Sequence, residues 1–301
     1  IPLALHVWNF ALPARNHLQT AFGLSVGNIF RYHGLKTEAD KRRVLDLYHQ
    51  SFAEHRISPY DPTPLDRIQV KFLPQENPPR AEVDFTAFDR AMSEAVDKYH
   101  FNNFDVPIEG MGGGTFHERY PPRIGEFSEE TPQYQAMFAS YVRQLESHFR
   151  ERGWLDMAYV YWFDEPEPRD YDFVAQGMRR LKQSAPGIRR MLTEEPGENA
   201  LAGLVDIWCP VSFNYDHAAA EKTRESSINP RQPIRRTNPR HHLVEGFESV
   251  ILHQHTWQRI ITRPMGVGDC FVEHALSLEP VCGAAVQFGR QAGLGVQQLL
   301  L

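Results

Sequence analysis

The chain has 301 residues, of which 42% are hydrophobic and 23% are charged, and its formal net charge is −6. These values are ordinary for a soluble globular protein and allow one large domain or two small ones. No long basic run and no stretch of eighteen apolar residues occurs, so neither a nucleic-acid partner nor a membrane span is expected. The three cysteines include no CxxC pair, which argues against a disulfide framework.

The first predicted helices and strands alternate along the chain. Thr37, with Asp40 three residues later, is typical of a helix N-terminus, and apolar residues follow at helical spacing. A second helix is predicted from about Asp84 to Tyr99. Each of these helices precedes a short predicted strand with a polar end, in segments 56–62 and 101–110.

The middle of the chain repeats this alternation with clearer boundaries. Thr131 predicts an N-cap, Pro132 fits the first helical position, and Gly153 ends the helix. A further helix is predicted over 173–181. The remaining predicted strands are 157–163, 188–196 and a third within 205–216.

Alternating helices and strands indicate βα units around a parallel sheet. No glycine-rich phosphate turn follows the first strand, so a closed (β/α)8 barrel fits better than an open doubly wound sheet. Residues 1–220 form the recognisable part of this predicted barrel. Residues 221–301 form an atypical C-terminal segment, interpreted as a diverged, truncated or frameshifted end, so the barrel is expected to be incomplete or irregular there.

The most informative motif is "YVYWFDEPEP", in which an aromatic run ends on Asp164 and Glu165 and is stopped by Pro166. Neighbouring side chains of a regular strand point to opposite faces, but at a strand end both acids can turn toward the mouth of a barrel. An apolar setting and a neighbouring negative charge favour a protonated carboxyl, as a general acid requires. The pair is therefore the predicted catalytic site, with capping or a solvated loop as the alternative.

Other polar or aromatic residues are predicted near the carboxyl ends of the strands, where barrels hold their active sites. The candidate substrate-binding residues are Tyr60, Asp61, Asp105, Trp162, Glu194, Glu195, Asn214 and Tyr215. For each, a structural role as loop, rim or core residue is the alternative; Trp162 in particular is either a sugar-stacking platform or core.

No metal site or cofactor is predicted. The only tight histidine clusters, His241–His242 and 253–255, lack a typical zinc spacing with a third ligand. No G-x-S-x-G elbow occurs, and Cys209 lies within an apolar strand as a predicted core residue.

Several segments together resemble the catalytic domain of glycoside hydrolase family 123, whose members are β-N-acetylgalactosaminidases. They are "IPLALHVWNFALP", "TAFGLSVGNIFRYHG", "HRISPYDP", "YVYWFDEP" and "VDIWCPVSFNYD", over residues 1–216. The resemblance implies a (β/α)8 barrel, a glycan substrate, and an N-terminal β-sandwich domain in the full-length product. Because the chain starts at Ile1, we expect a piece of a longer product or a mature form. The resemblance favours a periplasmic or extracellular location.

The resemblance also implies substrate-assisted, retaining removal of a β-linked N-acetylhexosamine. The 2-acetamido oxygen of the sugar would attack the anomeric carbon, with Glu165 as general acid and then base, and Asp164 holding the acetamido N–H. This mechanism needs no second carboxylate across the sugar ring. Tyr215 is the candidate to support the acetamido group.

Two other functions remain open at the level of sequence. In a retaining glycosidase of the two-carboxylate type, Glu165 would be the acid/base and Glu245 or Glu248 the nucleophile. In a non-catalytic glycan-binding or defective barrel fragment, replacing Glu165 would change little.

Overall fold

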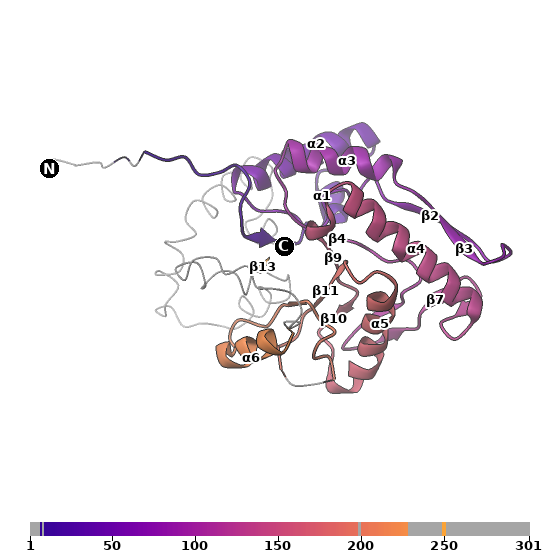
Figure 1. Cartoon of the computed structure of the whole chain (residues 1–301). Helices are drawn as coiled ribbons and strands as arrows, with labels where there is room; N and C mark the ends of the chain where they lie inside the picture. The colour runs from indigo at the N-terminus through magenta and orange to yellow at the C-terminus, as the bar shows by residue number, and fades with distance from the viewer. Residues whose placement is uncertain (1–6, 8, 198–199, 228–248, 251–301) are drawn as a thin grey trace.

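The computed structural model describes residue 7 and residues 9–197, 200–227 and 249–250. These residues form a mixed α/β fold in which helices lie around a central parallel sheet (Figure 1). The helices are α1 Val26–Tyr32, α2 Glu38–Glu54, α3 Thr86–Asp97, α4 Pro132–Glu151, α5 Tyr171–Ser184 and α6 His217–Ser227, with short 3-10 turns at Leu155–Met157 and Pro168–Asp170. The strands are β1 Gln19–Thr20, β2 Gln69–Leu73, β3 Arg80–Asp84, β4 Phe104–Asp105, β5 Gly113–Thr115, β6 Arg119–Tyr120, β7 Arg123–Ile124, β8 Phe127–Ser128, β9 Ala158–Val160, β10 Phe163–Asp164, β11 Arg189–Leu192, β12 Ile207–Trp208 and β13 Ser249–Val250.

The four predicted helices are confirmed as α2, α3, α4 and α5. Their start signals act as expected: the Thr37 hydroxyl accepts the backbone N–H of Asp40, and the Thr131 hydroxyl accepts that of Tyr134. These bonds satisfy amide groups that the first helical turn leaves without a partner.

Helix α4 contributes a large part of the hydrophobic core. Seven of its residues are buried, and they recur every three or four positions: Tyr134, Met137, Phe138, Tyr141, Val142, Leu145 and Phe149. Full burial of such a side chain contributes roughly 1.5–3 kcal/mol, so this stripe fixes the helix against the sheet. The apolar face of the β2–β3 hairpin packs on the same cluster, with the Phe72 ring 5.7 Å from that of Tyr141.

The central sheet has four parallel strands in the order β12–β11–β9–β4. Further bonds extend it beyond β4. The Asp105 N–H donates to the Tyr60 carbonyl, Pro59 forms a parallel bridge with Phe22, and β1 pairs in parallel with β13. The predicted strand near 56–62 is thus present only as this bridge.

The described strands form an open succession. Its members are, in order, β13, β1, the Pro59 segment, β4, β9, β11 and β12. Within the described residues β12 and β13 do not pair with each other, so no closed barrel is seen there. The atypical segment 221–301 lies mostly outside the described residues, and so do Glu245, Glu248 and the histidine clusters.

The glycine-rich segment that begins at Gly110 contains strand β5, which lies beside the predicted catalytic pair Asp164 and Glu165. Strand β5 pairs in parallel with β10, so that Thr115 is the register partner of Asp164. A Cβ atom on Gly114 would lie 2.5 Å from the Glu118 carbonyl oxygen and 2.7 Å from the Phe163 ring. Only glycine therefore allows this strand to approach so closely.

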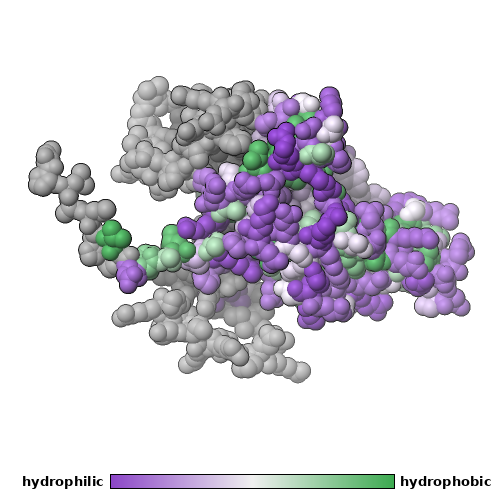
Figure 2. Space-filling model, turned by 90° about the horizontal axis from the view of Figure 1, so that it is seen from above, coloured by the Kyte–Doolittle hydropathy of each residue, from purple (hydrophilic) through white to green (hydrophobic). Residues whose placement is uncertain are grey.

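The surface of the described part is largely hydrophilic in the view of Figure 2, with green residues on the N-terminal arm. Val7, Phe10 and Leu12 are exposed on that arm. None of the described helices is long and apolar enough to cross a membrane.

Candidate active site

Asp164 and Glu165 lie at the carboxyl end of the central strands, and the backbone turns sharply between them. Asp164 is the last residue of β10, whereas Glu165 has a φ of 45°, in the left-handed region that residues other than glycine rarely adopt. Such a conformation costs about 1–3 kcal/mol and persists where surrounding bonds enforce it. Because of this turn, the two acids escape the strict alternation of a strand.

Two hydroxyl groups hold the pair. The Tyr161 hydroxyl donates a short hydrogen bond to the Asp164 carboxylate. The Thr193 hydroxyl, just after β11, accepts the backbone N–H of Glu165 at 2.9 Å and lies 3.5 Å from Asp164 Oδ1. Burial and the charge of Asp164 raise the pKa of Tyr161, so its hydroxyl stays protonated and remains a donor.

The Glu165 side chain differs from that of Asp164 in its contacts. In the described part of the chain it makes no hydrogen bond or ion pair, although the residue is only partly exposed. Asp164 is thus fixed by a partly buried tyrosine, while Glu165 keeps its carboxylate available for a ligand.

Asp105, at the end of β4, lies beside this network. Its carboxylate accepts the backbone N–H of Tyr161 at 3.0 Å, which links the ends of β4 and β9. Although part of the residue is accessible, the atoms crowded around the carboxyl raise its pKa to about 7, and the charge of Asp61 adds to this shift. Asp105 is therefore partly protonated near neutral pH.

Tyr60 and Asp61 adjoin Asp105 on the neighbouring segment. Asp61 forms an ion pair with Arg67 at 2.6 Å, but burial still raises the pKa of the Asp61 carboxyl. Burial and the charges of Asp61 and Asp105 raise the pKa of Tyr60. The structure thus brings Tyr60, Asp61 and Asp105 together, as expected from their places at strand ends.

Glu194 and Glu195 follow Thr193 at the end of β11. Burial, with the nearby charge of Glu195, raises the pKa of Glu194 to about 7, and the Tyr171 hydroxyl is hydrogen-bonded to Glu194. Glu195 accepts the backbone N–H of Val211 at 3.3 Å. Both acids therefore lie at the same edge of the sheet as Asp164, one strand away.

The remaining predicted residues lie farther from this network. The Trp162 ring packs on helix α5, where a Cβ on Gly177 would lie 2.3 Å from it, and near Phe173. This position favours the core alternative for Trp162. Asn214 and Tyr215 lie in an exposed segment, where the Tyr215 hydroxyl is 3.2 Å from His217 Nδ1.

Other chemistries find little support among the described residues. Burial raises the pKa of Cys209 to about 12, so its thiol stays protonated near neutral pH. Within the described ranges, no three His, Cys, Asp or Glu side chains are grouped so as to hold a metal ion.

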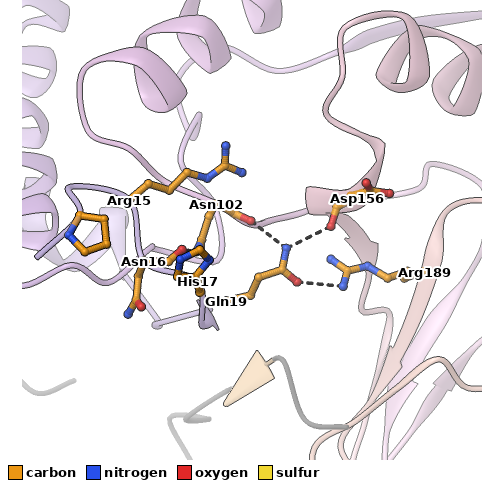
Figure 3. Close-up of a pocket in the computed structure, with 8 residues that line it drawn as sticks. Arg15, Asn16, His17, Gln19, Asn102, Asp156 and Arg189 are labelled. Atoms are coloured by element: carbon orange, nitrogen blue, oxygen red, sulfur yellow. Dashed lines mark hydrogen bonds between the residues drawn. The ribbon is translucent and has the colours of Figure 1, made fainter. Parts of the chain in front are cut away.

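A cavity of about 580 Å³ lies at the opposite, amino end of the strands (Figure 3). Its polar groups are cross-linked: the Gln19 amide donates to the carbonyls of Asn102 and Asp156 at 2.9 and 3.0 Å, and Gln19 Oε1 accepts from Arg189. None of the predicted site residues lines it. We place the candidate site at the carboxyl end and not at this cavity, because the carboxyl groups with perturbed pKa values lie at the carboxyl end.

Sequence reasoning did not identify Tyr161 as the hydrogen-bond partner of Asp164. It also did not identify Thr193 as the residue that links the ends of β10 and β11. Tyr161 stands three residues before Asp164, a spacing that could have drawn attention to it. Thr193 carries no such signal, because its role depends on two strands meeting in space.

Comparison with known proteins shows a distant likeness among solved structures. No family model and no curated protein matches the chain. Among solved structures, the chain is similar to a family 123 glycoside hydrolase from Clostridium perfringens, whose structural analysis concerns glycolipid glycan hydrolysis. The TM-score is 0.45 and the identity 13%, over 74% of this chain and 44% of the other. The chain thus spans less than half the length of that enzyme.

Proposed function

We propose that the carboxyl end of the parallel strands is the active site of a glycoside hydrolase that removes β-linked N-acetylhexosamine, with N-acetylgalactosamine as the first candidate. The observation that carries this proposal is that the carboxylates of Asp164 and Glu165 differ in their hydrogen bonding. Asp164 is bound by the Tyr161 hydroxyl, whereas the Glu165 carboxylate has no protein partner among the described residues. Substrate-assisted catalysis needs one fixed acceptor and one mobile proton carrier side by side.

In the proposed reaction, the acetamido oxygen of the substrate attacks the anomeric carbon while Glu165 gives its proton to the departing glycosidic oxygen. The bond from that carbon to the leaving oxygen breaks, and a bicyclic oxazolinium ion forms. Glu165, now a carboxylate, removes a proton from water, whose oxygen attacks the same carbon and reopens the ring. Two displacements at one carbon retain its configuration.

Asp164 would accept the acetamido N–H and stabilise the positive charge of the oxazolinium ion. A carboxylate has about four acceptor sites, so it can accept both this N–H and the Tyr161 hydroxyl. Tyr215, Asn214, Glu194 and Glu195 remain candidates for contacts with the sugar or its aglycone.

We further propose that the strand succession belongs to a (β/α)8 barrel. In such a barrel the last strand pairs with the first, and the strands otherwise follow chain order. The pairing of β13 with β1, followed by the Pro59 segment, β4, β9, β11 and β12, agrees with that order. Asp164 and Glu165 would then follow the fourth strand.

The test is hydrolysis of an aryl β-N-acetylgalactosaminide, its gluco epimer and the plain β-galactoside by the chain and by Glu165→Gln. We expect turnover of acetamido sugars only, and a loss of about 10²–10⁴-fold in kcat for the variant, as for removal of a general acid. Turnover of the plain galactoside would instead favour a protein nucleophile. No turnover by folded protein would favour a non-catalytic glycan-binding fragment.

A further inference from the structure

The Thr193 hydroxyl occupies a position between the two residues of the pair. It accepts the Glu165 backbone N–H at 2.9 Å, and lies 3.3 Å from the Tyr161 hydroxyl and 3.5 Å from Asp164 Oδ1. A hydroxyl has one proton and two lone pairs. Thr193 can therefore accept from Glu165 and share its single proton between Tyr161 and Asp164.

Its bond to Glu165 falls at the strained point of the chain. Glu165 adopts a left-handed backbone conformation, with a φ of 45°, although it has a Cβ atom. A conformation of this kind reverts unless neighbouring contacts fix it. The Glu165 amide is fixed from another strand, because Thr193 directly follows β11 whereas Glu165 directly follows β10.

The surroundings of Thr193 make this bond hard to replace. The residue is 8% exposed, so water has little access to take over from its hydroxyl. A buried N–H that loses its acceptor is unfavourable, and the backbone can avoid this by turning the N–H elsewhere. Such a turn would carry the Glu165 side chain with it.

We propose that Thr193 is a positioning residue that aims the Glu165 carboxylate at the glycosidic oxygen by holding the left-handed turn, and that it steadies Asp164 through Tyr161. This inference rests on the proposed function for its effect on rate, but the geometric part concerns the chain alone. Glu165 remains the group that touches the substrate, and Thr193 acts through it.

The experiment compares Thr193→Val, which keeps the shape but removes the hydroxyl, with Thr193→Ser, which keeps the hydroxyl. Thr115→Val is the matched control: Thr115 is the register partner of Asp164, and among the described residues its hydroxyl makes one hydrogen bond, in which it accepts the His117 backbone N–H. For each variant, kcat and KM on the aryl acetamido sugar and a crystal structure are determined.

We expect Thr193→Val to lower kcat about 10- to 100-fold, because displacement of a reacting group by about 1 Å costs on that order. KM should change less than about threefold, since ground-state binding does not use the proton of Glu165. Thr193→Ser should restore kcat to within about threefold of the original, and Thr115→Val should leave it within about twofold. The crystal structure of Thr193→Val should show Glu165 outside the left-handed region.

An unchanged kcat in Thr193→Val would overturn the proposal, and so would an equal loss in Thr193→Ser, which would point to packing of the methyl group. If the original chain hydrolyses no sugar, the proposed function fails, and the crystal structures alone decide the positioning role. Glu165 keeping its backbone conformation and side-chain direction in Thr193→Val would then refute it, and its displacement there but not in Thr193→Ser would support it.

Discussion

The two ends of the parallel strands both carry polar residues, but they use them differently. At the amino end, the Gln19 side chain is bonded to two backbone carbonyls and to Arg189, around a cavity of about 580 Å³. At the carboxyl end, the pKa values of Asp105 and Glu194 are raised to about 7 by burial. This cavity therefore lies where polar groups tie the chain together, whereas the acids with perturbed pKa values lie at the carboxyl end of the strands.

The largest expected difference between the two ends is in activity. Asp164→Asn should lower kcat on the acetamido sugar about 10²–10³-fold, because the acceptor for the developing cation loses its charge. Tyr161→Phe should cause a smaller loss, since only one of the bonds to Asp164 disappears. Full activity of Asp164→Asn, measured under saturating substrate, would remove Asp164 from the mechanism.

Stability should respond most at the amino end. Gln19→Met leaves the Asn102 and Asp156 carbonyls without this donor, so we expect the free energy of unfolding to fall by about 1–3 kcal/mol. The kcat/KM of the folded variant should stay within about twofold. Urea unfolding measures the first quantity, with Gln69→Met as control, because the Gln69 residue is exposed and, within the described residues, its side chain hydrogen-bonds only to the Arg67 carbonyl two residues away. A large loss of kcat/KM in Gln19→Met would contradict the division between the two ends.

The pH dependence of the free energy of unfolding should distinguish Asp105 from acids in ordinary ion pairs. Its pKa is raised in the folded chain, so the folded state binds the proton more tightly and stability falls as pH rises from about 4 to about 7. Asp105→Asn should remove a decline on the order of a few kcal/mol across that window. The measurement is urea unfolding of both proteins at several pH values.

Asp66→Asn provides the opposite case. The Arg42 hydrogen bond lowers the pKa of Asp66 in the folded chain. The ionised Asp66 therefore contributes its full stabilisation above the pKa it has in the unfolded chain, and this contribution is lost only as the pH falls below that pKa. The stability difference between this variant and the original should stay level from pH 5 to 7. A level difference for Asp105→Asn as well would show that the Asp105 carboxyl is solvated.

Local sequence signals predicted the helices well and the contacts of the site poorly. Thr131, Pro132 and the apolar stripe sufficed for α4, because capping and periodicity act within a few residues. The alternation of Val70 with Phe72 could also have predicted the β2–β3 hairpin, although it was overlooked.

The site depends on contacts between strands that are far apart along the chain. The sequence placed Asp164 and Glu165 at a strand end, but not the left-handed turn between them. The bond from Glu165 to Thr193 joins residues 28 positions apart, and no periodicity encodes it. Trp162 is a case in which the sequence suggested a site residue that the structure places in packing. Its aromatic character fits a sugar platform, yet Gly177 leaves a space on α5 that the Trp162 ring fills.

The most direct test of the proposed mechanism is calorimetric binding of the thiazoline derived from N-acetylgalactosamine, a stable analogue of the bicyclic intermediate in which sulfur replaces the acetamido oxygen. It needs no turnover, and it measures whether the carboxyl end recognises the charge distribution that substrate assistance creates. The account predicts binding at least 10²-fold tighter than that of N-acetylgalactosamine itself, lost in Asp164→Asn and kept in Gln19→Met. Equal affinity for the analogue and the free sugar, or binding unaffected by Asp164→Asn, would contradict it.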